Sequence, residues 1–389
     1  MELNTDQRAA VAACADSIAS RQPVTRLFGY AGTGKTTIVR DIVLETGIDP
    51  SAVIYAAPTG KAAAVLTRKG NPAKTIHSLL YQPPVKVKEG SKREFRWTID
   101  DAKAYLAARA RLLVIDEASM VGTKLGTDIM SLGIPVLAIG DPAQLQPVND
   151  RQFFMSDPPT AQLTEIMRNT GDVLACAQAI RELGVSAVRG FPAIAIGQVG
   201  QSSALSYSQI IVGRNKTRDG KNLKVRSLLG YDNDERVVLG ERIICLRNNY
   251  GFGCLNGQQF TVNEIDSSLS SRYSSIGMMV ARLTCDCGME ESWCPTCGWN
   301  SNRLMPIWLR GFDGHEGEKE LGDKGYSDGQ RAMMATYGYC ITAHKSQGSE
   351  WPSVLVIDES WGKERVNWLY TAVTRAQEEV AIIKPAARK

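Results

Sequence analysis

A glycine-rich segment near the start of the chain, Gly29 to Thr37, contains the pattern G-x-x-x-x-G-K-[ST]. The apolar run before it predicts a short strand over residues 24–28, and residues 38–44 after it have helical apolar spacing. Glycines in this context let backbone amides turn toward one anion, and the helix adds its positive dipole end. Lys35 is expected at the β- and γ-phosphates and Thr36 on Mg²⁺. The segment therefore predicts a nucleoside triphosphate site, whose expected residues are Gly29, Gly32, Thr33, Gly34, Lys35, Thr36 and Thr37.

Two adjacent carboxylates, Asp116 and Glu117, follow the apolar run 111–115. In phosphate-loop enzymes one such acid holds Mg²⁺ and the other polarises the attacking water. We assign Asp116 to the metal, together with Thr36, and Glu117 to the water. Gln144 follows the next apolar run, in the polar segment 140–148, where its amide is placed to contact the γ-phosphate or the water and to report hydrolysis to another domain.

Two arginines further along the chain, Arg168 and Arg375, have the charge that phosphoryl transfer requires. Negative charge builds between the phosphates in the transition state, and an inserted guanidinium stabilises it. If both arginines belong to a second domain, they reach the nucleotide only when the domains close. The triphosphate site is then expected to depend on domain closure.

Composition sets broad limits on the kind of protein. The 389 residues suffice for two or more domains, and 43% hydrophobic with 22% charged residues predict a globular chain. No apolar run reaches the length of a membrane span, and the first residues are unlike a signal peptide, so we expect a cytoplasmic protein without membrane contact. The net charge of +4 is too small to establish a polyanionic partner, but it allows a local basic groove.

The elements that must position these side chains are read from the spacing of apolar residues. Short, near-continuous apolar runs at 53–57, 111–115 and 135–139 predict an α/β fold whose parallel sheet is buried on both faces. Functional loops are then expected at the carboxyl ends of the strands. Residues 81–100 alternate like a β-hairpin, and residues 254–330, rich in Gly, Ser and Asp, predict a small β-rich insertion before the α/β pattern returns.

In order and spacing, the motifs resemble those of superfamily 1 helicases of subgroup B, the RecD-like and Dda-like group that moves 5′ to 3′ on single-stranded DNA. Besides the segments named above, the resemblance is carried by LNTDQR at 3–8, APTGKAA at 57–63, TIHSLL at 75–80, YCITAHKSQGSEW at 339–351 and YTAVTR at 370–375. It implies two RecA-like parallel-sheet domains. The first is 1–165, with a duplex-splitting hairpin at 81–100; the second is 166–253 with 331–389, interrupted by an SH3-like β-rich insertion at 254–330.

The resemblance also implies roles for individual residues. It assigns Gln7 to adenine and Glu350 to the nucleotide site. It matches Arg375 to the arginine-finger motif and Arg168 to an earlier arginine motif. Phe95 and Trp97 of the hairpin either stack on bases or pack the hairpin onto its domain. The DNA-contacting motifs have small, polar or cationic side chains, which suit phosphate and sugar contacts that ignore sequence. Their matches here are Pro58, Thr59, Lys61, Thr75, His77, Thr342, His344 and Lys345.

Four of the nine cysteines form a cluster in the sequence, at Cys285, Cys287, Cys294 and Cys297. In a reducing compartment such a cluster indicates a metal before a disulfide, and four thiolates can close a tetrahedral site. We expect structural Zn²⁺ there, although the gap between the two pairs is short and the resembling family lacks this feature. Reduced cysteines without metal, or an iron–sulfur cluster, are the alternatives.

From these patterns we expect an ATP- and Mg²⁺-dependent DNA helicase. It would be a monomer that acts on single-stranded DNA and on junctions of single and double strands, with single-strand-binding or replication proteins as partners. Three alternatives stay open: a translocase that strips proteins from DNA with little unwinding, an enzyme that acts on RNA, and a non-catalytic DNA-binding clamp. The short chain, compared with the family, suggests a phage-encoded or accessory enzyme.

Overall fold

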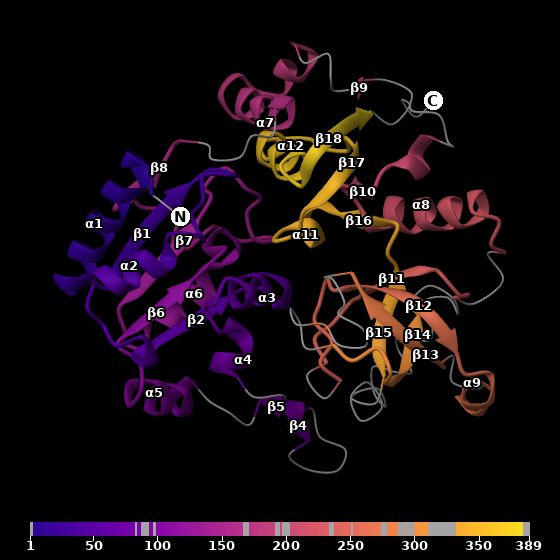
Figure 1. Ribbon diagram of the computed structural model, residues 1–389, viewed down its shortest axis with the longest axis horizontal. Helices are drawn as coiled ribbons and strands as arrows, with labels where there is room; N and C mark the ends of the chain where they lie inside the picture. Colours follow the sequence, from indigo (N-terminus) through magenta and orange to yellow (C-terminus); the bar gives the residue numbers. More distant parts are fainter. Residues whose placement is uncertain are drawn as a thin grey trace. The chain divides into compact units, whose positions relative to one another are not determined.

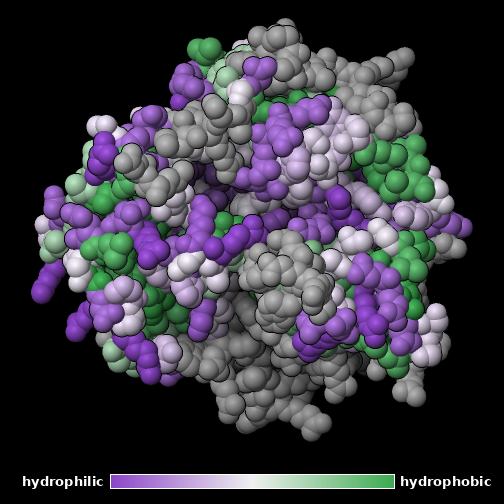
Figure 2. All heavy atoms as spheres, viewed as in Figure 1, coloured by the Kyte–Doolittle hydropathy of each residue, from purple (hydrophilic) through white to green (hydrophobic). Residues whose placement is uncertain are grey.

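The computed structural model describes residues 3–81, 84–86, 93–95, 99–165, 171–190, 195–196, 203–232, 237–249, 252–273, 278–286, 294, 299–309 and 332–383. The chain divides into two compact units, whose elements are labelled in Figure 1. Unit 1 is Met1–Gly184 with Val366–Thr374, and unit 2 is Val185–Arg365 with Arg375–Lys389. None of the helices in the described part of the chain is long and apolar enough to cross a membrane. On the face drawn in Figure 2, apolar side chains form separate patches among hydrophilic ones.

Unit 1 is built on a parallel sheet of six strands in the order β3-β2-β6-β7-β1-β8. The strands are β1 Val24–Gly29, β2 Val53–Ala57, β3 Ala73–Thr75, β6 Leu112–Ile115, β7 Val136–Gly140 and β8 Ala161–Leu163. β6 and β7 are buried along their whole length, which confirms the predicted sheet covered on both faces.

Helices cover both faces of this sheet. The apolar sides of α1 (Thr5–Ala19) and α2 (Val39–Glu45) form one core with the strands, and those of α4 (Ile76–Leu80), α5 (Ile99–Ala107) and α6 (Thr123–Met130) form the other. The remaining helices of the unit are α3 (Gly60–Arg68), α7 (Gly171–Leu183), most of α12 (Arg365–Val373), and the 3-10 turns η1 (Pro50–Ala52) and η2 (Ala118–Met120).

The predicted hairpin is present as two short antiparallel strands, β4 (Pro84–Lys86) and β5 (Arg93–Phe95), with Pro84 opposite Phe95. Trp97 lies outside the described residues, and the direction of the Phe95 side chain is not described. The hairpin is therefore confirmed, while the stacking role of its aromatic residues stays a prediction.

Unit 2 contains a second parallel sheet, in the order β16-β10-β17-β18-β9. Its strands are β9 Ala195–Ile196, β10 Gln209–Val212, β16 Cys340–Thr342, β17 Trp351–Ile357 and β18 Ala376–Ile383. Its helices are α8 (Asn215–Leu228) and α11 (Ala343–Ser346), with the 3-10 turns η3 (Val185–Gly190) and η4 (Ser203–Ser206). Two parallel sheets in one chain confirm the predicted α/β class.

The β-rich insertion of unit 2 is a closed five-stranded barrel. It consists of β11 (Arg242–Cys245), β12 (Gln259–Ile265), β13 (Met278–Cys285), β14 (Leu304–Leu309) and β15 (Met333–Tyr337), with α9 (Ser267–Tyr273) after β12. Neighbouring strands are antiparallel except β14 and β15, which are parallel, so the barrel is mixed. β11 and β15, which close it, come from outside the predicted range 254–330.

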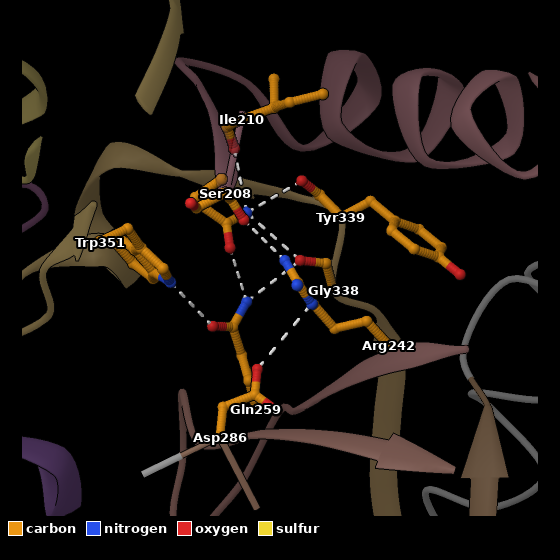
Figure 3. A network of polar contacts seen from close by, with 9 residues as sticks. Ser208, Ile210, Arg242, Gln259, Asp286, Gly338, Tyr339 and Trp351 are labelled. Atoms are coloured by element: carbon orange, nitrogen blue, oxygen red, sulfur yellow. Dashed lines mark hydrogen bonds and ion pairs between the residues drawn. The ribbon is translucent and has the colours of Figure 1, made fainter. Parts of the chain in front are cut away.

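A network of buried polar contacts joins the barrel to the sheet within unit 2 (Figure 3). The side-chain amide of Gln259, at the start of β12, donates to Oε1 of Gln209 at 2.8 Å and to the Gly338 carbonyl at 3.1 Å. The Trp351 indole donates to Oε1 of Gln259 at 3.3 Å, and Gln209 donates to the Tyr339 carbonyl at 2.9 Å. Gln209 and Gln259 are buried, so each bond is made in a low-dielectric setting and fixes the barrel against β10.

Candidate functional site

The glycine-rich loop follows β1, whose last residue is Gly29. Gly32 and Gly34 have φ of 82° and 81°, a left-handed conformation that disfavours any side chain. These turns bring the chain into α2, with the Thr37 amide bonded to the Gly34 carbonyl at 2.9 Å. The Lys35 ammonium donates to the Tyr30 carbonyl of the loop at 2.8 Å. The strand, loop and helix predicted from the sequence are therefore present, and the lysine is held where phosphate oxygens can replace a carbonyl.

Gln7 fixes the start of α1 against this loop. Asn4 caps α1 by accepting from the Gln7 amide at 2.7 Å, and Oε1 of Gln7 accepts from the Asn4 amide in return at 3.2 Å. The Gln7 side-chain nitrogen donates to the Thr33 carbonyl at 3.4 Å. The segment is thus positioned beside the loop, and the adenine contact of Gln7 stays a prediction.

The predicted magnesium ligands lie together. The Thr36 hydroxyl donates to Oδ2 of Asp116 at 3.0 Å, across the carboxyl ends of β1 and β6. Burial raises the pKa of Asp116, while the Glu117 amide, the Thr36 hydroxyl and the charge of Lys35 act in the opposite direction. A hydroxyl and a buried carboxylate beside a lysine fit a cation that is shared with phosphates. The donor set therefore fits Mg²⁺.

Glu117 has an unusual backbone. Its φ of 53° and ψ of 38° place it in the left-handed region, which costs a residue with a side chain about 1–2 kcal/mol. The Glu117 amide donates to Oδ1 of Asp116 at 2.9 Å, which closes this turn between β6 and η2. A left-handed residue at this point changes the direction of the chain beside Asp116, and the water-directing role of the Glu117 carboxylate stays a prediction.

Gln144 lies on the loop after β7 and is 3% exposed. Its backbone carbonyl accepts from the Gln152 side chain at 3.1 Å. Its side-chain oxygen Oε1 is buried and has no hydrogen-bond partner among the described residues. Such an acceptor is costly to leave unmatched, so it is expected to be satisfied by a donor that arrives with a ligand. The attacking water predicted from the sequence is a donor of this kind.

Tyr370 of α12 joins this loop to the phosphate loop. Its hydroxyl donates to Oδ2 of Asp141 at 2.7 Å and accepts from the Ala31 amide at 3.1 Å, all within unit 1. Burial and the neighbouring Asp141 raise the pKa of Tyr370 well above its ordinary value, so the phenol keeps the proton that it donates. The sequence had not indicated this role, because the partners are 229 and 339 positions away and no local pattern links them.

Two further contacts attach α12 to the residues that flank Gln144. The Asn367 side chain donates to the Ala143 carbonyl at 2.9 Å, and the Leu145 amide donates to the Thr371 hydroxyl at 2.9 Å. The helix therefore holds the loop on both sides of the residue predicted to report hydrolysis.

The predicted arginines are only partly described. Arg375, in unit 2, is 4% exposed and donates from Nη1 to the Ser349 carbonyl at 3.2 Å. Glu350 is exposed, and its Oε2 accepts from Gln377 at 3.2 Å. Arg168 lies outside the described residues. The catalytic role of both arginines and the nucleotide contact of Glu350 stay predictions.

The predicted DNA contacts of unit 1 gather at one edge of its sheet. β2 and β3 are parallel neighbours, with Ala57 opposite Thr75, so Pro58 and Thr75 stand at adjacent carboxyl ends. Thr59 caps α3 by accepting from the Ala62 amide at 3.2 Å, and Thr75 caps α4 in the same way. Lys61 lies in the first turn of α3.

His77, on α4, lies beside an aromatic neighbour. Its ring centroid is 5.8 Å from that of Tyr81. Partial withdrawal of the ring from water, and the charge of Lys124, lower the pKa of His77 below its ordinary value. At neutral pH the ring is therefore uncharged and suited to a hydrogen bond with DNA rather than to an ion pair.

In unit 2 the predicted contacts follow β16. Thr342 ends this strand, and His344 and Lys345 lie on α11. Burial lowers the pKa of His344, against the opposing charge of Glu364. The Lys345 ammonium donates to Oδ1 of Asn256, in the β11–β12 connection of the barrel, at 2.9 Å.

The cysteine cluster is described only in part. Cys285 and Cys294 are buried in the barrel core with Phe260 and Trp299, and the Cys294 amide donates to the Trp299 carbonyl at 2.8 Å. Cys287 and Cys297 lie outside the described residues. Within the described ranges, no group of three or more metal-binding side chains occurs.

Two family models match the chain. The AAA domain model matches residues 2–193, and the UvrD-like helicase C-terminal domain model matches residues 337–383. The chain is 25% identical over 405 residues to the ATP-dependent RecD2 DNA helicase of Deinococcus radiodurans, in an alignment that covers 93% of this chain and 47% of that protein. The chain thus spans about half the length of this curated relative.

Solved structures show the same fold. A Pif1 helicase studied during unwinding at forked double-stranded DNA has a TM-score of 0.62 at 18% identity, with 98% of this chain and 92% of that chain covered. Bacteroides Pif1 bound to single-stranded DNA has a TM-score of 0.60 at 17% identity, with the same coverage. At such identities the likeness concerns the fold of two RecA-like sheets with a barrel insertion.

A phosphate-loop sheet domain combined with a helicase-type C-terminal domain defines a protein of the helicase class. The two family matches and the RecD2 relative place the chain in superfamily 1, subgroup B, as the order of its motifs predicted.

Proposed function

We propose that this chain is an ATP-dependent DNA helicase that moves 5′ to 3′ on single-stranded DNA. The observation that carries the proposal is the nucleotide site: Thr36 is bonded to Asp116 at 3.0 Å beside the phosphate loop, and the buried Oε1 of Gln144 has no partner among the described residues. A triphosphate, its cation and an attacking water match these groups. The RecD2 relative and DNA-bound Bacteroides Pif1 support DNA as the polymer.

We propose a separate task for each residue of the site. Lys35 exchanges the Tyr30 carbonyl for phosphate oxygens, and Thr36 with Asp116 holds the cation. Mg²⁺, when bound, neutralises charge on the phosphates and the leaving group. Glu117 removes a proton from the attacking water, and Gln144 accepts a hydrogen bond from that water.

The proposed coupling runs through α12. Asn367 and Thr371 bond the backbone on either side of Gln144, and Arg375 follows the same helix in the chain. A shift of the Gln144 loop after hydrolysis would therefore displace the helix that leads to the arginine finger. Arg375, which belongs to unit 2, is proposed to enter the nucleotide site on closure and to leave it on opening, which would move the units alternately along the strand. Arg168 falls within the range of unit 1, not in a second domain as expected, so its proposed contact with the phosphates would not depend on closure.

A strand-displacement assay tests both the activity and its direction. Duplexes with a 5′ or a 3′ single-stranded tail are incubated with the chain, ATP and Mg²⁺. We expect displacement from the 5′-tailed duplex alone. Displacement from the 3′-tailed duplex alone would contradict the direction. Displacement of streptavidin from a biotinylated single strand, without any duplex separation, would favour the translocase alternative.

The remaining features are finer proposals. We propose a monomer that acts at junctions of single and double strands in the cytoplasm, with single-strand-binding or replication proteins as partners. The barrel is proposed to correspond to the SH3-like insertion in the second domain of the family. Structural Zn²⁺ at Cys285, Cys287, Cys294 and Cys297 has no support from the relatives, and the burial of Cys285 and Cys294 among apolar side chains favours reduced thiols. Elemental analysis of the purified protein decides between them, because a preparation without zinc or iron rejects the metal.

A further inference from the structure

We propose that Trp361, with Arg214 beside it, is a stacking position for a nucleobase of single-stranded DNA in unit 2. The inference rests on the proposed function and adds a contact that no motif in the sequence had indicated. Trp361 follows β17, and Arg214 precedes α8. The Arg214 guanidinium lies over the Trp361 ring, 4.3 Å from its centroid.

Trp361 is far more exposed than three other tryptophans of the chain. Its side chain is 63% exposed, whereas the other tryptophans whose burial is described, Trp299, Trp351 and Trp368, are at most 9% exposed. Tryptophan is highly buried on average in folded proteins, so an exposed indole held by a neighbour needs a reason. Arg214 restricts the ring by a cation–π contact and leaves most of its surface open to a ligand.

Trp361 lies near the carboxyl ends of three neighbouring strands. β16, β10 and β17 are parallel neighbours, and Thr342 is opposite Val212, so their carboxyl ends share one edge. Neighbouring strands lie about 4.8 Å apart, so these three ends span about 10 Å. Trp361 is therefore on the edge that carries the expected DNA contacts of unit 2.

Two carboxylates of the segment after β17, Asp358 and Glu359, are hydrogen-bonded to neighbouring groups of unit 2. Glu359 accepts from the Arg214 amide at 3.1 Å and from the Thr217 hydroxyl at 2.6 Å. Asp358 is 6% exposed and accepts from the Arg365 guanidinium at 3.4 Å. These bonds fix the backbone that carries Arg214 while its guanidinium stays at the surface. An open aromatic ring beside an exposed cation suits a base with its phosphate, because stacking is tolerant of sequence and the cation attracts the backbone.

The test compares two strands that carry the same charge. Anisotropy titrations use a labelled oligothymidine and an abasic oligonucleotide of equal length. Trp361→Ala is expected to weaken oligothymidine binding by about 5-fold or more, the effect of losing one stacked base, and to leave abasic binding unchanged. Trp361→Tyr should retain most of the affinity, because the ring is kept.

Tyr105 offers a matched control. It is 46% exposed and has the Arg109 guanidinium 4.3 Å from its ring, but it lies on α5, which leads into the amino end of β6. Tyr105→Ala should bind both strands as the wild type does. Unchanged binding by Trp361→Ala, or equal losses on both strands, would overturn the inference. If single-stranded DNA does not change the rate of ATP hydrolysis by the wild type, the proposed function is refuted instead.

Discussion

Replacing Tyr370 with phenylalanine removes one hydroxyl and keeps the ring that fills the same space. The hydroxyl makes two buried hydrogen bonds, to Oδ2 of Asp141 at 2.7 Å and from the Ala31 amide at 3.1 Å. A bond to a charged acceptor contributes about 1.5–3 kcal/mol and a neutral one about 0.5–1.5 kcal/mol. We therefore expect Tyr370→Phe to lower the free energy of unfolding of unit 1 by about 2–4 kcal/mol.

Equilibrium urea denaturation, followed by circular dichroism, measures this change. Hydrogen exchange of peptides that contain Ala31 should be faster in the variant, because its amide loses an acceptor. Tyr30→Phe is the matched control. It removes a hydroxyl whose bond from Gln162, at 3.0 Å, is exposed, and it should change stability by about 0.5 kcal/mol or less. A Tyr370→Phe variant as stable as this control would refute the account of how α12 is held to the phosphate loop.

Four further substitutions test other parts of the structure. Glu117→Gly should abolish ATP hydrolysis. It should leave the free energy of unfolding unchanged, or raise it by up to about 1 kcal/mol, because glycine adopts the left-handed φ without strain. Clear destabilisation of this variant in urea would show that Glu117 is not strained in the wild type. Gln259→Met should lower the free energy of unfolding of unit 2 by about 2–4 kcal/mol, since it removes the amide at the centre of the barrel network; a wild-type urea midpoint would show that the network contributes little. Lys345→Ala should reduce the slope of log affinity for single-stranded DNA against log salt by about 0.7. His344→Asn should leave that slope unchanged at neutral pH. The pKa of His344 is lowered below its ordinary value of 6.5, so the ring is uncharged at neutral pH. A change in slope as large as that of Lys345→Ala would show that the histidine is charged.

The nucleotide site could be predicted from the sequence because its parts are local. The glycine loop needs only the strand before it and the helix after it, and Asp116 and Glu117 follow directly from a buried strand. Parallel strands then bring separate carboxyl ends to one edge, so Thr36 and Asp116 meet although 80 positions separate them. The same rule explains why Pro58 and Thr75 stand at adjacent strand ends, although the sequence had not indicated a strand that ends at Thr75.

The contacts of α12 and the closure of the barrel could not be predicted in this way. Tyr370 meets Asp141 and Ala31 through packing of a distant helix, and its hydroxyl has no local pattern that marks it as buried. The barrel uses β11 and β15, whose apolar residues resemble those of the neighbouring sheet strands, so the sequence predicted a narrower insertion. The exposure of Trp361 depends on its neighbours in three dimensions. From the sequence alone, a tryptophan is expected to be buried.

The central claim is that the glycine loop belongs to a motor that single-stranded DNA activates. ATP hydrolysis by the wild type and by Lys35→Ala, each with and without single-stranded DNA, tests this most directly. The wild type should hydrolyse ATP faster when the DNA is present. Lys35→Ala should lose this activity by at least about 100-fold, because the ammonium that contacts the phosphates is gone, while its circular dichroism spectrum stays that of the wild type. Normal turnover by a folded Lys35→Ala variant, or wild-type hydrolysis that DNA does not change, would contradict the account.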